Sequence, residues 1–297
     1  MNQAKNVKKA SSAPVVKAPP SGHKPLDNLA PRDIQNLAEE LVAYHEEFAD
    51  LYQRREQRQW AEFYLQGQLS DLERKTVEPM VLAMKGRDAN AVRAVQQFLG
   101  EGTWDDAAIL ARREKLVAQD IGEAEGGLIC DGSGFPKKGA HSVGVAPQYC
   151  GAVGNIANSQ QGVFLVYLGS RGHTFVDRRL SLPKHWFGAQ YREKRERCGV
   201  PTDLEFQTEP ELALEMVEGV VKRAQLPFQW VCADEHYGMN PAFLDGLDAL
   251  GKWYFAEVPK NTMVWPAEVE IIAPGKGSMG GRARGRWSLL GRRRPQR

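Results

Sequence analysis

The spacing of the apolar residues changes once along the chain, near Gly126, and this change limits the possible folds. From Pro31 to about Gly122, apolar residues recur three or four positions apart, as they do on one face of a helix. Beyond Gly126 they alternate or form short runs, as in strands. The pattern predicts an all-helical N-terminal domain of four or five helices over residues 29–124, followed by an α/β domain with a mixed sheet over residues 125–272.

Short apolar segments bounded by turn-forming residues define the predicted strands. They cover residues 127–131, 142–149, 163–168, 174–180, 228–234 and 253–258. Thr208-Glu-Pro-Glu211 forms a capping box with a proline in the first turn, which predicts a helix over residues 209–224. A second helix is expected over residues 241–250. Two more capping boxes, Ser70–Glu73 and Thr103–Asp106, predict helix starts in the N-terminal domain.

The two ends of the chain differ in composition from its middle. Residues 1–28 are rich in Lys, Ala, Pro and Ser, and residues 273–297 are rich in Gly and Arg, so both are expected to be disordered basic tails. Residues 1–25 and 275–297 together carry thirteen Lys and Arg side chains and no acid, so the net charge of +2 becomes −11 without them. Basic tails suit nucleic-acid binding or simple solvation, and charge alone does not decide between the two.

The overall composition excludes several classes of protein. Of 297 residues, 42% are hydrophobic and 26% are charged. No apolar run approaches the ~20 residues of a membrane helix, and the first 25 residues lack the apolar segment of a secretory signal. The four cysteines show no CxxC spacing, so we expect neither a zinc site nor a disulfide framework, but reduced thiols in a cytoplasmic protein.

Two of the apolar strands end in an aspartate. Asp131 follows "LIC", and Asp234 follows "VCA" 103 residues later. If these strands are parallel and adjacent, both carboxylates lie at the same carboxyl edge of the sheet, where open α/β sheets place their sites. Two carboxylates there repel unless a cation lies between them, and oxygen ligands suit Mg²⁺ or Mn²⁺. Each aspartate could also be a turn former that caps the next amides, and the pattern alone leaves both interpretations open.

The stretch from Ile129 to Pro183 resembles the start of the catalytic domain in DDE transposases of bacterial insertion sequences, most of all the insertion-sequence seven-oh-one type. The features that carry the resemblance are an aspartate followed by a Gly-Phe-x-Lys-Lys-Gly turn, then Gln-Tyr-x-Gly, Asn-x-Gln-x-Gly-Val-Phe and Asp-Arg-x-Leu-x-Leu-Pro. Later, "ADEHYG" resembles the second aspartate of the family with its Tyr-Gly, and "YFAEVPKNTMVWP" resembles the strand that follows. The likeness extends over residues 30–270.

This resemblance implies a ribonuclease-H-like fold and a metal-dependent transposase, an enzyme that cleaves a DNA strand and transfers it. It implies that Asp131 and Asp234 are catalytic ligands of two Mg²⁺ (or Mn²⁺) ions, and that the partner is double-stranded DNA at the element ends and the target. Lys137 and Lys138 lie where a phosphate backbone could approach, although a solvated turn would explain them equally well. A cytoplasmic, nucleoid-associated protein without membrane contacts is expected, and a homo-oligomer is possible.

Other ionisable residues carry weaker signals. Glu235 adjoins Asp234 but alternates to the other face of an extended chain, so we expect it to be a poor ligand. Glu257 lies in a strand near the predicted site and is expected to be an ordinary surface or salt-bridged carboxylate. Four dispersed histidines lack metal-ligand spacing and are expected to be structural or exposed: His141, His173, His185 and His236.

The family pattern includes a third carboxylate, a glutamate on a downstream helix, which this chain does not match. After Glu270 there is no acidic residue, and the segment that follows is rich in Gly and Arg. Either this segment is a native basic arm, or the reading frame shifts near residues 270–278; we expect the frameshift. A site with two carboxylates predicts little cleavage by this chain alone. Alternative functions are a non-catalytic, DNA-binding regulatory fragment and another ribonuclease-H-like nuclease.

Overall fold

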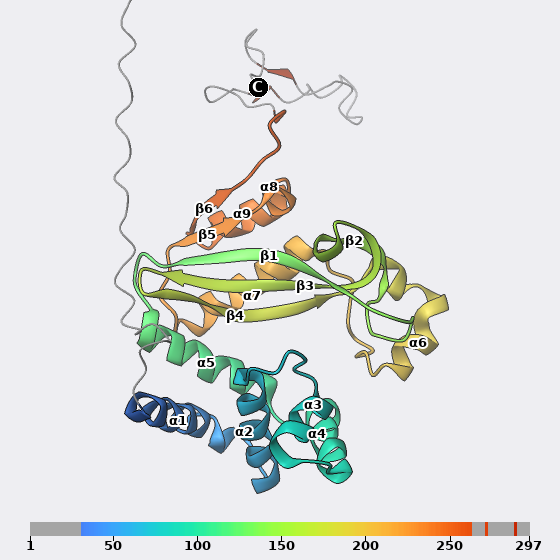
Figure 1. Ribbon diagram of the computed structural model, residues 1–297. Coiled ribbons are helices and arrows are strands. Elements are labelled where there is room, and N and C mark those ends of the chain that lie inside the picture. Colours follow the sequence, from blue (N-terminus) through green and yellow to red (C-terminus); the bar gives the residue numbers. More distant parts are fainter. Residues whose placement is uncertain (1–30, 263–270, 273–287, 290–297) are drawn as a thin grey trace, which may run out of the picture. The chain divides into compact units, whose positions relative to one another are not determined.

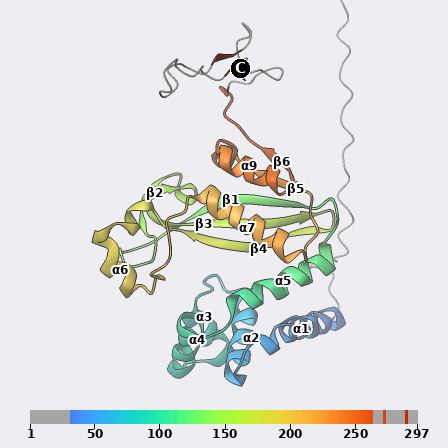
Figure 2. The same ribbon diagram turned by 180° about the vertical axis from the view of Figure 1, so that it is seen from behind.

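A computed structural model describes residues 31–262 and two short strands at residues 271–272 and 288–289. Figures 1 and 2 show it from opposite sides. The predicted tails, residues 1–28 and 273–297, lie outside the described residues except for 288–289. The mixture of a helical N-terminal part and a mixed sheet agrees with the predicted fold class.

The chain divides into two compact units. The first contains the residues up to Glu123 together with residues 169–176 and 225–227, and the second contains the remainder. The described helices of the first unit, five of them α-helical, agree with the predicted helical pattern. They are α1 (Pro31–Glu46), the 3-10 helix η2 (Ala49–Leu51), α2 (Arg55–Leu69), α3 (Val77–Lys85), α4 (Ala89–Glu101) and α5 (Asp106–Ile121).

The core of the first unit lies between α2, α3 and α4. Phe63, Met80 and Val95 come from these three helices and pack together almost out of contact with solvent. Gly67 permits the close approach of α2 and α3, since a Cβ at this position would lie 2.6 Å from the Met80 sulfur. Trp60 packs against the same cluster. The aromatic residues of α2 therefore belong to a core, as their helical spacing predicts.

Two predicted helix starts in this unit are wrong. Ser70 ends α2, because its hydroxyl donates to a carbonyl one turn earlier at 2.7 Å, and α3 begins only at Val77. The cap of α5 is Asp105, whose carboxylate accepts from the N–H of Ala108 at 2.9 Å, and not Thr103. The capping-box pattern finds suitable residue types, but it cannot tell which of several neighbouring side chains reaches the free amides.

The second unit contains a mixed sheet with the strand order β2-β3-β1-β5-β6, and β4 pairs with β3. The β1–β3 and β2–β3 pairs are antiparallel, whereas β1–β5 and β5–β6 are parallel. This sheet has the predicted ribonuclease-H-like arrangement, with the two aspartate-bearing strands adjacent. The strands are β1 (Gly127–Pro136), β2 (Ala146–Cys150), β3 (Asn155–Gly169), β4 (Gly172–Ser181), β5 (Trp230–Ala233) and β6 (Trp253–Ala256).

The remaining described elements of this unit are mostly short. The two longest helices, α7 and α9, agree with the helices predicted after residues 208 and 240. These elements are η3 (Gly151–Val153), η4 (Lys184–Phe187), η5 (Ala189–Tyr191), α6 (Arg192–Arg197), α7 (Glu209–Arg223), α8 (Glu235–Gly238) and α9 (Pro241–Ala249), with the antiparallel pair β7 (Ile271–Ile272) and β8 (Ser288–Leu289).

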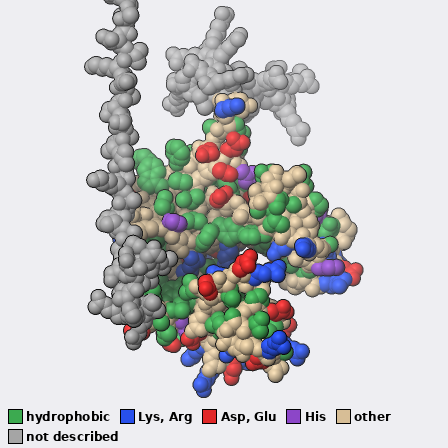
Figure 3. Space-filling view, viewed as in Figure 1, with side chains coloured by type: hydrophobic (Ala, Val, Ile, Leu, Met, Phe, Trp, Pro, Cys, Tyr) green, Lys and Arg blue, Asp and Glu red, His purple; other side chains and the backbone are tan. Residues whose placement is uncertain are grey.

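Helix α7 runs along one face of the sheet (Figures 1 and 2). Side chains alternate along a strand, so Leu128 and Cys130 share that face, and both are buried. The opposite face is largely apolar but open to solvent. Large side chains exposed on this face include Leu168 (45%), Trp230 (38%), Trp253 (60%) and Phe255 (70%), and Figure 3 shows hydrophobic side chains gathered over β5 and β6 on this side.

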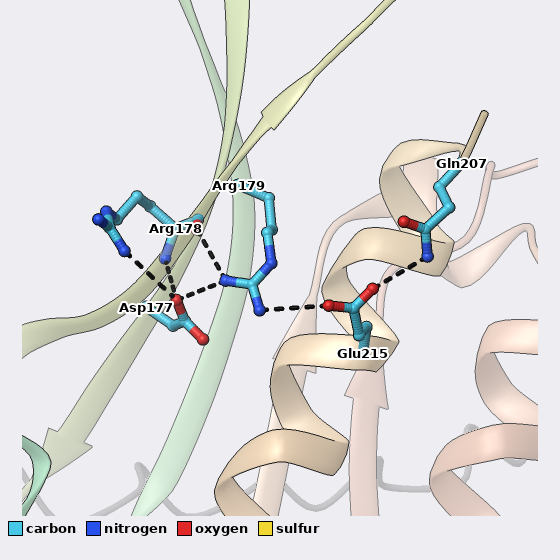
Figure 4. A network of polar contacts seen from close by, with 5 residues as sticks. All are labelled: Asp177, Arg178, Arg179, Gln207 and Glu215. Atoms are coloured by element: carbon cyan, nitrogen blue, oxygen red, sulfur yellow. Dashed lines mark hydrogen bonds and ion pairs between the residues drawn. The ribbon is translucent and has the colours of Figure 1, made fainter. Parts of the chain in front are cut away.

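A polar network joins α7 to β4. Asp177, in the Asp-Arg-x-Leu-x-Leu-Pro segment, is buried and paired with Arg179, which also reaches Glu215 on α7 (Figure 4). Gln207 donates to the other oxygen of Glu215. This segment of the sequence therefore helps to fix the position of α7 on the sheet.

Candidate active site

Asp131 and Asp234 occupy equivalent positions on two neighbouring parallel strands. The register of β1 and β5 sets Cys130 beside Ala233. Each aspartate is the next residue along its chain, so both lie where the pairing of β1 with β5 ends, although β1 itself continues beyond Asp131. The structure thus brings together the two aspartates that the sequence predicts to be neighbours.

Both carboxylates are exposed, and each accepts a local hydrogen bond from the backbone. Asp131 Oδ1 accepts from the N–H of Gly132 at 2.7 Å. Asp234 Oδ1 accepts from the N–H of His236 at 2.9 Å and caps α8. These bonds agree with a turn-forming role, but each uses one oxygen of a group that has about four lone-pair sites. Both aspartates therefore keep the capacity to bind a further group.

The two aspartates line one cavity of about 370 Å³, and a third carboxylate, Glu209, lines it with them. Glu209 is the first residue of α7, which packs against the sheet and leads into β5, so the helix begins near the edge where β5 ends. Glu209 Oε2 lies 3.6 Å from Nε2 of His236, another lining residue. Sequence reasoning missed Glu209, although the return of a crossover helix to this edge was a usable signal.

The capping box of α7 does not require the Glu209 side chain. Glu211 Oε2 accepts from the N–H of Thr208 at 2.7 Å and lies 2.8 Å from the Thr208 hydroxyl oxygen. These hydrogen bonds hold the pKa of Glu211 below its usual value. The box thus uses one glutamate of the Thr-Glu-Pro-Glu segment and leaves the other one facing the cavity.

Tyr237 lies at the cavity with its side chain almost completely buried. It is 1% exposed, and its hydroxyl has no hydrogen-bond partner among the described residues. Burial raises the pKa of Tyr237, and the negative charge of Glu209 raises it further, with smaller contributions from the two aspartates. The hydroxyl therefore stays protonated and remains a donor. Buried donors without an acceptor are uncommon in proteins, and a group bound in the cavity would provide one.

Gly132, the residue after Asp131, lies next to the side chains of Glu209 and Tyr237. A Cβ at this position would lie 3.3 Å from Glu209 Oε2 and 3.7 Å from the Tyr237 hydroxyl oxygen. The missing side chain is thus what lets the glutamate approach the strand closely.

The cysteines beside the aspartates pack rather than react. Burial raises the pKa of Cys130 to about 12, with a smaller contribution from Cys232. Burial also raises the pKa of Cys232. Because the thiolate is the reactive form, both thiols are poor nucleophiles and poor metal ligands at neutral pH.

The remaining predicted residues fall in different places. By the β5–β6 register Glu257 follows the strand beside Asp234, yet neither Glu257 nor Glu235 is among the described residues that line the cavity. Of the four dispersed histidines, His236 lines it. Lys137 and Lys138 are exposed beyond the end of β1. Among the described residues, no three His, Cys, Asp or Glu side chains already stand close enough to hold a metal ion together.

Comparison with known proteins identifies the family of the chain. The profile of the DDE superfamily endonuclease family matches residues 47–297. The chain belongs to this family. The neighbouring positions of its two aspartates agree with the sequence resemblance to DDE transposases.

A curated relative points to the same group of proteins. The chain is 28% identical over 201 residues to a protein of Microchaete diplosiphon described as a probable transposase for the insertion sequence element IS701. The match covers 67% of this chain and 48% of the relative, so the chain spans about half the length of the relative. Within the described ranges, no helix has both the length and the apolar character to cross a membrane.

Proposed function

We propose that the chain performs the chemistry of an insertion-sequence transposase: metal-dependent cleavage of a DNA strand at the element end, followed by transfer of that strand to target DNA. The observation that supports this most strongly is the strand register, which sets Asp131 and Asp234 side by side at one cavity. Membership of the DDE superfamily endonucleases supports the same conclusion.

The chemistry of the cavity fits a divalent cation. Mg²⁺ and Mn²⁺ prefer oxygen ligands, and the described lining includes three carboxylates but no Lys or Arg. Ionised carboxylates that share one cavity repel each other, and a bound cation offsets this repulsion. We propose Asp131 and Asp234 as ligands. Bound there, divalent ions would activate the attacking oxygen and neutralise the leaving one.

The proposed reaction consists of two displacements at phosphorus. In the first, the oxygen of a water molecule bonds to phosphorus and the bond to the 3′ oxygen breaks, which leaves a 3′-hydroxyl and a 5′-phosphate. In the second, the freed 3′ oxygen bonds to a target phosphorus and displaces a 3′ oxygen of the target. The exposed rim of the cavity, with both aspartates accessible, allows a DNA backbone to approach.

Lys137 and Lys138 are suited to contact the same DNA away from the cleaved bond. At ~3.3 Å per residue, Lys137 lies at most ~20 Å from Asp131 along β1, about the length of six base pairs. The turn that carries both lysines is held in place by Asn158, whose Nδ2 donates to the carbonyls of Lys137 at 2.9 Å and Gly139 at 2.8 Å. We propose that these lysines contact backbone phosphates.

Strand cleavage tests the proposal. The substrate is a duplex made from the DNA that flanks the gene, incubated with the purified chain and Mn²⁺. With two carboxylates alone, little cleavage would be expected. Because Glu209 adds a third carboxylate to the cavity, we expect measurable nicking. Asp131→Asn and Asp234→Asn should abolish it and leave duplex binding in a gel-shift assay nearly unchanged. Equal nicking by the wild type and both variants would contradict the proposal.

A second candidate function is a DNA-binding regulatory fragment of a transposase. It is favoured by one observation: among the described residues, no three His, Cys, Asp or Glu side chains stand close enough to hold a metal ion together. This function predicts salt-sensitive duplex binding by the wild type, no nicking in Mn²⁺, and no effect of Asp131→Asn on either. The same experiment therefore distinguishes the two candidates.

A further inference from the structure

Glu209 reaches the cavity by a route that is independent of the two aspartates. Asp131 lies within β1 and Asp234 directly follows β5, whereas Glu209 comes from the first turn of α7, which packs on the buried face of the sheet. Three separate elements of the second unit thus direct carboxylates into one cavity. This convergence is not a consequence of sequence proximity, because Glu209 is 25 residues before Asp234 and 78 residues after Asp131.

The carboxylate charges at this cavity are not balanced by the described residues that line it. The basic side chain beside Glu209 is the imidazole of His236, which is 58% exposed and whose Nε2 lies 3.6 Å from Glu209 Oε2. No Lys or Arg is among the described residues that line the cavity. Carboxylate oxygens are the ligands that Mg²⁺ and Mn²⁺ prefer, so a cavity with this composition suits a divalent cation.

The hydroxyl of Tyr237 is a second and independent sign of a ligand. It is a buried donor that no described residue satisfies. Its oxygen and Glu209 Oε2 both face the space beside Gly132, at 3.7 Å and 3.3 Å from the position of an added Cβ. A hydroxyl in this position can orient a glutamate or bind an oxygen of a ligand. To form such a hydrogen bond, the hydroxyl needs either a ligand in the cavity or a small movement of Glu209 towards it.

We infer that Glu209 is the third carboxylate ligand of the divalent-ion site, beside Asp131 and Asp234, and that Tyr237 positions it through its hydroxyl. This inference rests on the proposed function. The site assembled in this way draws its third ligand from the helix that precedes β5, and it does not require an acidic residue after position 270. Because the three carboxylates do not stand close enough to hold an ion together as described, they would have to move closer when one binds.

A purely helix-stabilising role for Glu209, or a ligand role for Glu257, would give a different experimental result. An acidic residue in the first turn of a helix stabilises the helix through the macrodipole, without any ligand. Glu257, at the end of the next parallel strand, is the rival third ligand, because the register sets it near Asp234 although it does not line the cavity. Glu257→Gln removes the same charge from the same sheet edge and is therefore the matched control.

The probe is Mn²⁺ alone, titrated into the full chain and followed by the electron paramagnetic resonance signal of the free ion. We expect Asp131→Asn and Glu209→Gln each to weaken Mn²⁺ binding by at least about tenfold. Glu257→Gln should change it by less than about twofold, because an exposed charge outside the cavity is screened. Glu209→Asp, which keeps the charge but shortens the side chain, should lie between Glu209→Gln and the wild type. Circular dichroism and thermal unfolding without Mn²⁺ establish that each variant is folded.

Every outcome of this titration bears on the inference. Weakened binding in Asp131→Asn and Glu209→Gln, with Glu257→Gln unaffected, supports it. If Asp131→Asn weakens binding and Glu209→Gln does not, the inference is overturned and the proposed function stands; a lower unfolding temperature of Glu209→Gln would then assign it to the helix macrodipole. Equal weakening by Glu209→Gln and Glu257→Gln shows a general charge effect and also overturns it. If the wild type does not bind Mn²⁺, or Asp131→Asn has no effect, the proposed function itself fails.

Discussion

Asp177 Oδ1 lies 2.7 Å from Nη1 of Arg179, and this pair is the buried end of a link between the sheet and α7. The aspartate is 3% exposed, and it also accepts from the N–H of Arg178 at 2.8 Å. The other guanidinium nitrogen of Arg179 lies 3.3 Å from Glu215 on α7. Because α7 begins with Glu209, this link contributes to the placement of the third carboxylate.

Replacing Arg179 with methionine should destabilise the second unit. Asp177 would lose its closest cation while it remained buried and would keep only the Arg178 guanidinium at 3.9 Å. Removing one partner of a buried ion pair costs about 3 kcal/mol, less what Arg178 and the backbone hydrogen bond retain. Arg192→Met is the control, because Arg192 pairs with Glu196 in a side-chain contact that is 79% and 55% exposed, and such pairs contribute little. Urea unfolding measures the loss of unfolding free energy in Arg179→Met and in Arg192→Met. A loss no greater for Arg179→Met than for the control would show that the link is not stabilising.

Thr208→Ala should shorten or fray the first turn of α7. Loss of an N-cap side chain costs about 1 kcal/mol, and in this protein it also removes one partner of Glu211. The pKa of Glu211 is lowered in the folded state, so its contribution is present above the unfolded pKa and is lost as pH falls through the folded pKa. The stability difference between wild type and variant should therefore shrink on acidification below the usual glutamate value of 4.5. Urea unfolding at neutral and acidic pH measures it, and a difference that is constant or grows on acidification would contradict this account.

The sequence singles out both aspartates because a short apolar segment followed by a carboxylate is a local pattern. It does not predict Glu209, because the capping box already gives the same residues a complete local role, and only the packing of α7 on the sheet shows which glutamate faces the cavity. The strand register that joins Asp131 to Asp234 depends on contacts between segments about 100 residues apart, which only the family resemblance anticipates.

Strand lengths are a second point where local patterns give an incomplete answer. The prediction ends the first strand at Asp131, since glycines and a proline follow, yet β1 continues to Pro136. Its partner β3 pairs with it over the whole length, with Pro136 opposite Ser159. Pairing between distant strands overrides the low strand propensity of Gly and Pro, and it extends β3 through a polar segment for the same reason.

Gly132→Ala should weaken Mn²⁺ binding without unfolding the chain. The new Cβ would lie 3.3 Å from Glu209 Oε2, closer than most Cβ contacts, and would push the carboxylate away from the strand. We expect a loss of about tenfold in affinity, as for other changes that misplace metal ligands. Gly100→Ala is the control, since nothing lies within 4 Å of its added Cβ. An unchanged Mn²⁺ affinity in Gly132→Ala would mean that Glu209 tolerates the displacement or does not bind the ion.

The open face of the sheet should promote self-association. Trp253 and Phe255 are 60% and 70% exposed and lie on the same face of β6, together with Trp230, whose ring centroid is 5.2 Å from that of Trp253. Exposed apolar patches of this kind mark surfaces that proteins cover with a partner or another segment. Replacing Trp253 and Phe255 together with serine should lower the concentration-dependent sedimentation of the purified chain and its binding of a hydrophobic dye. Leu69→Ser removes a side chain that is 67% exposed in the first unit and should change neither measurement. If the double variant sediments and binds dye as the wild type does, this face is not the surface through which the chain associates.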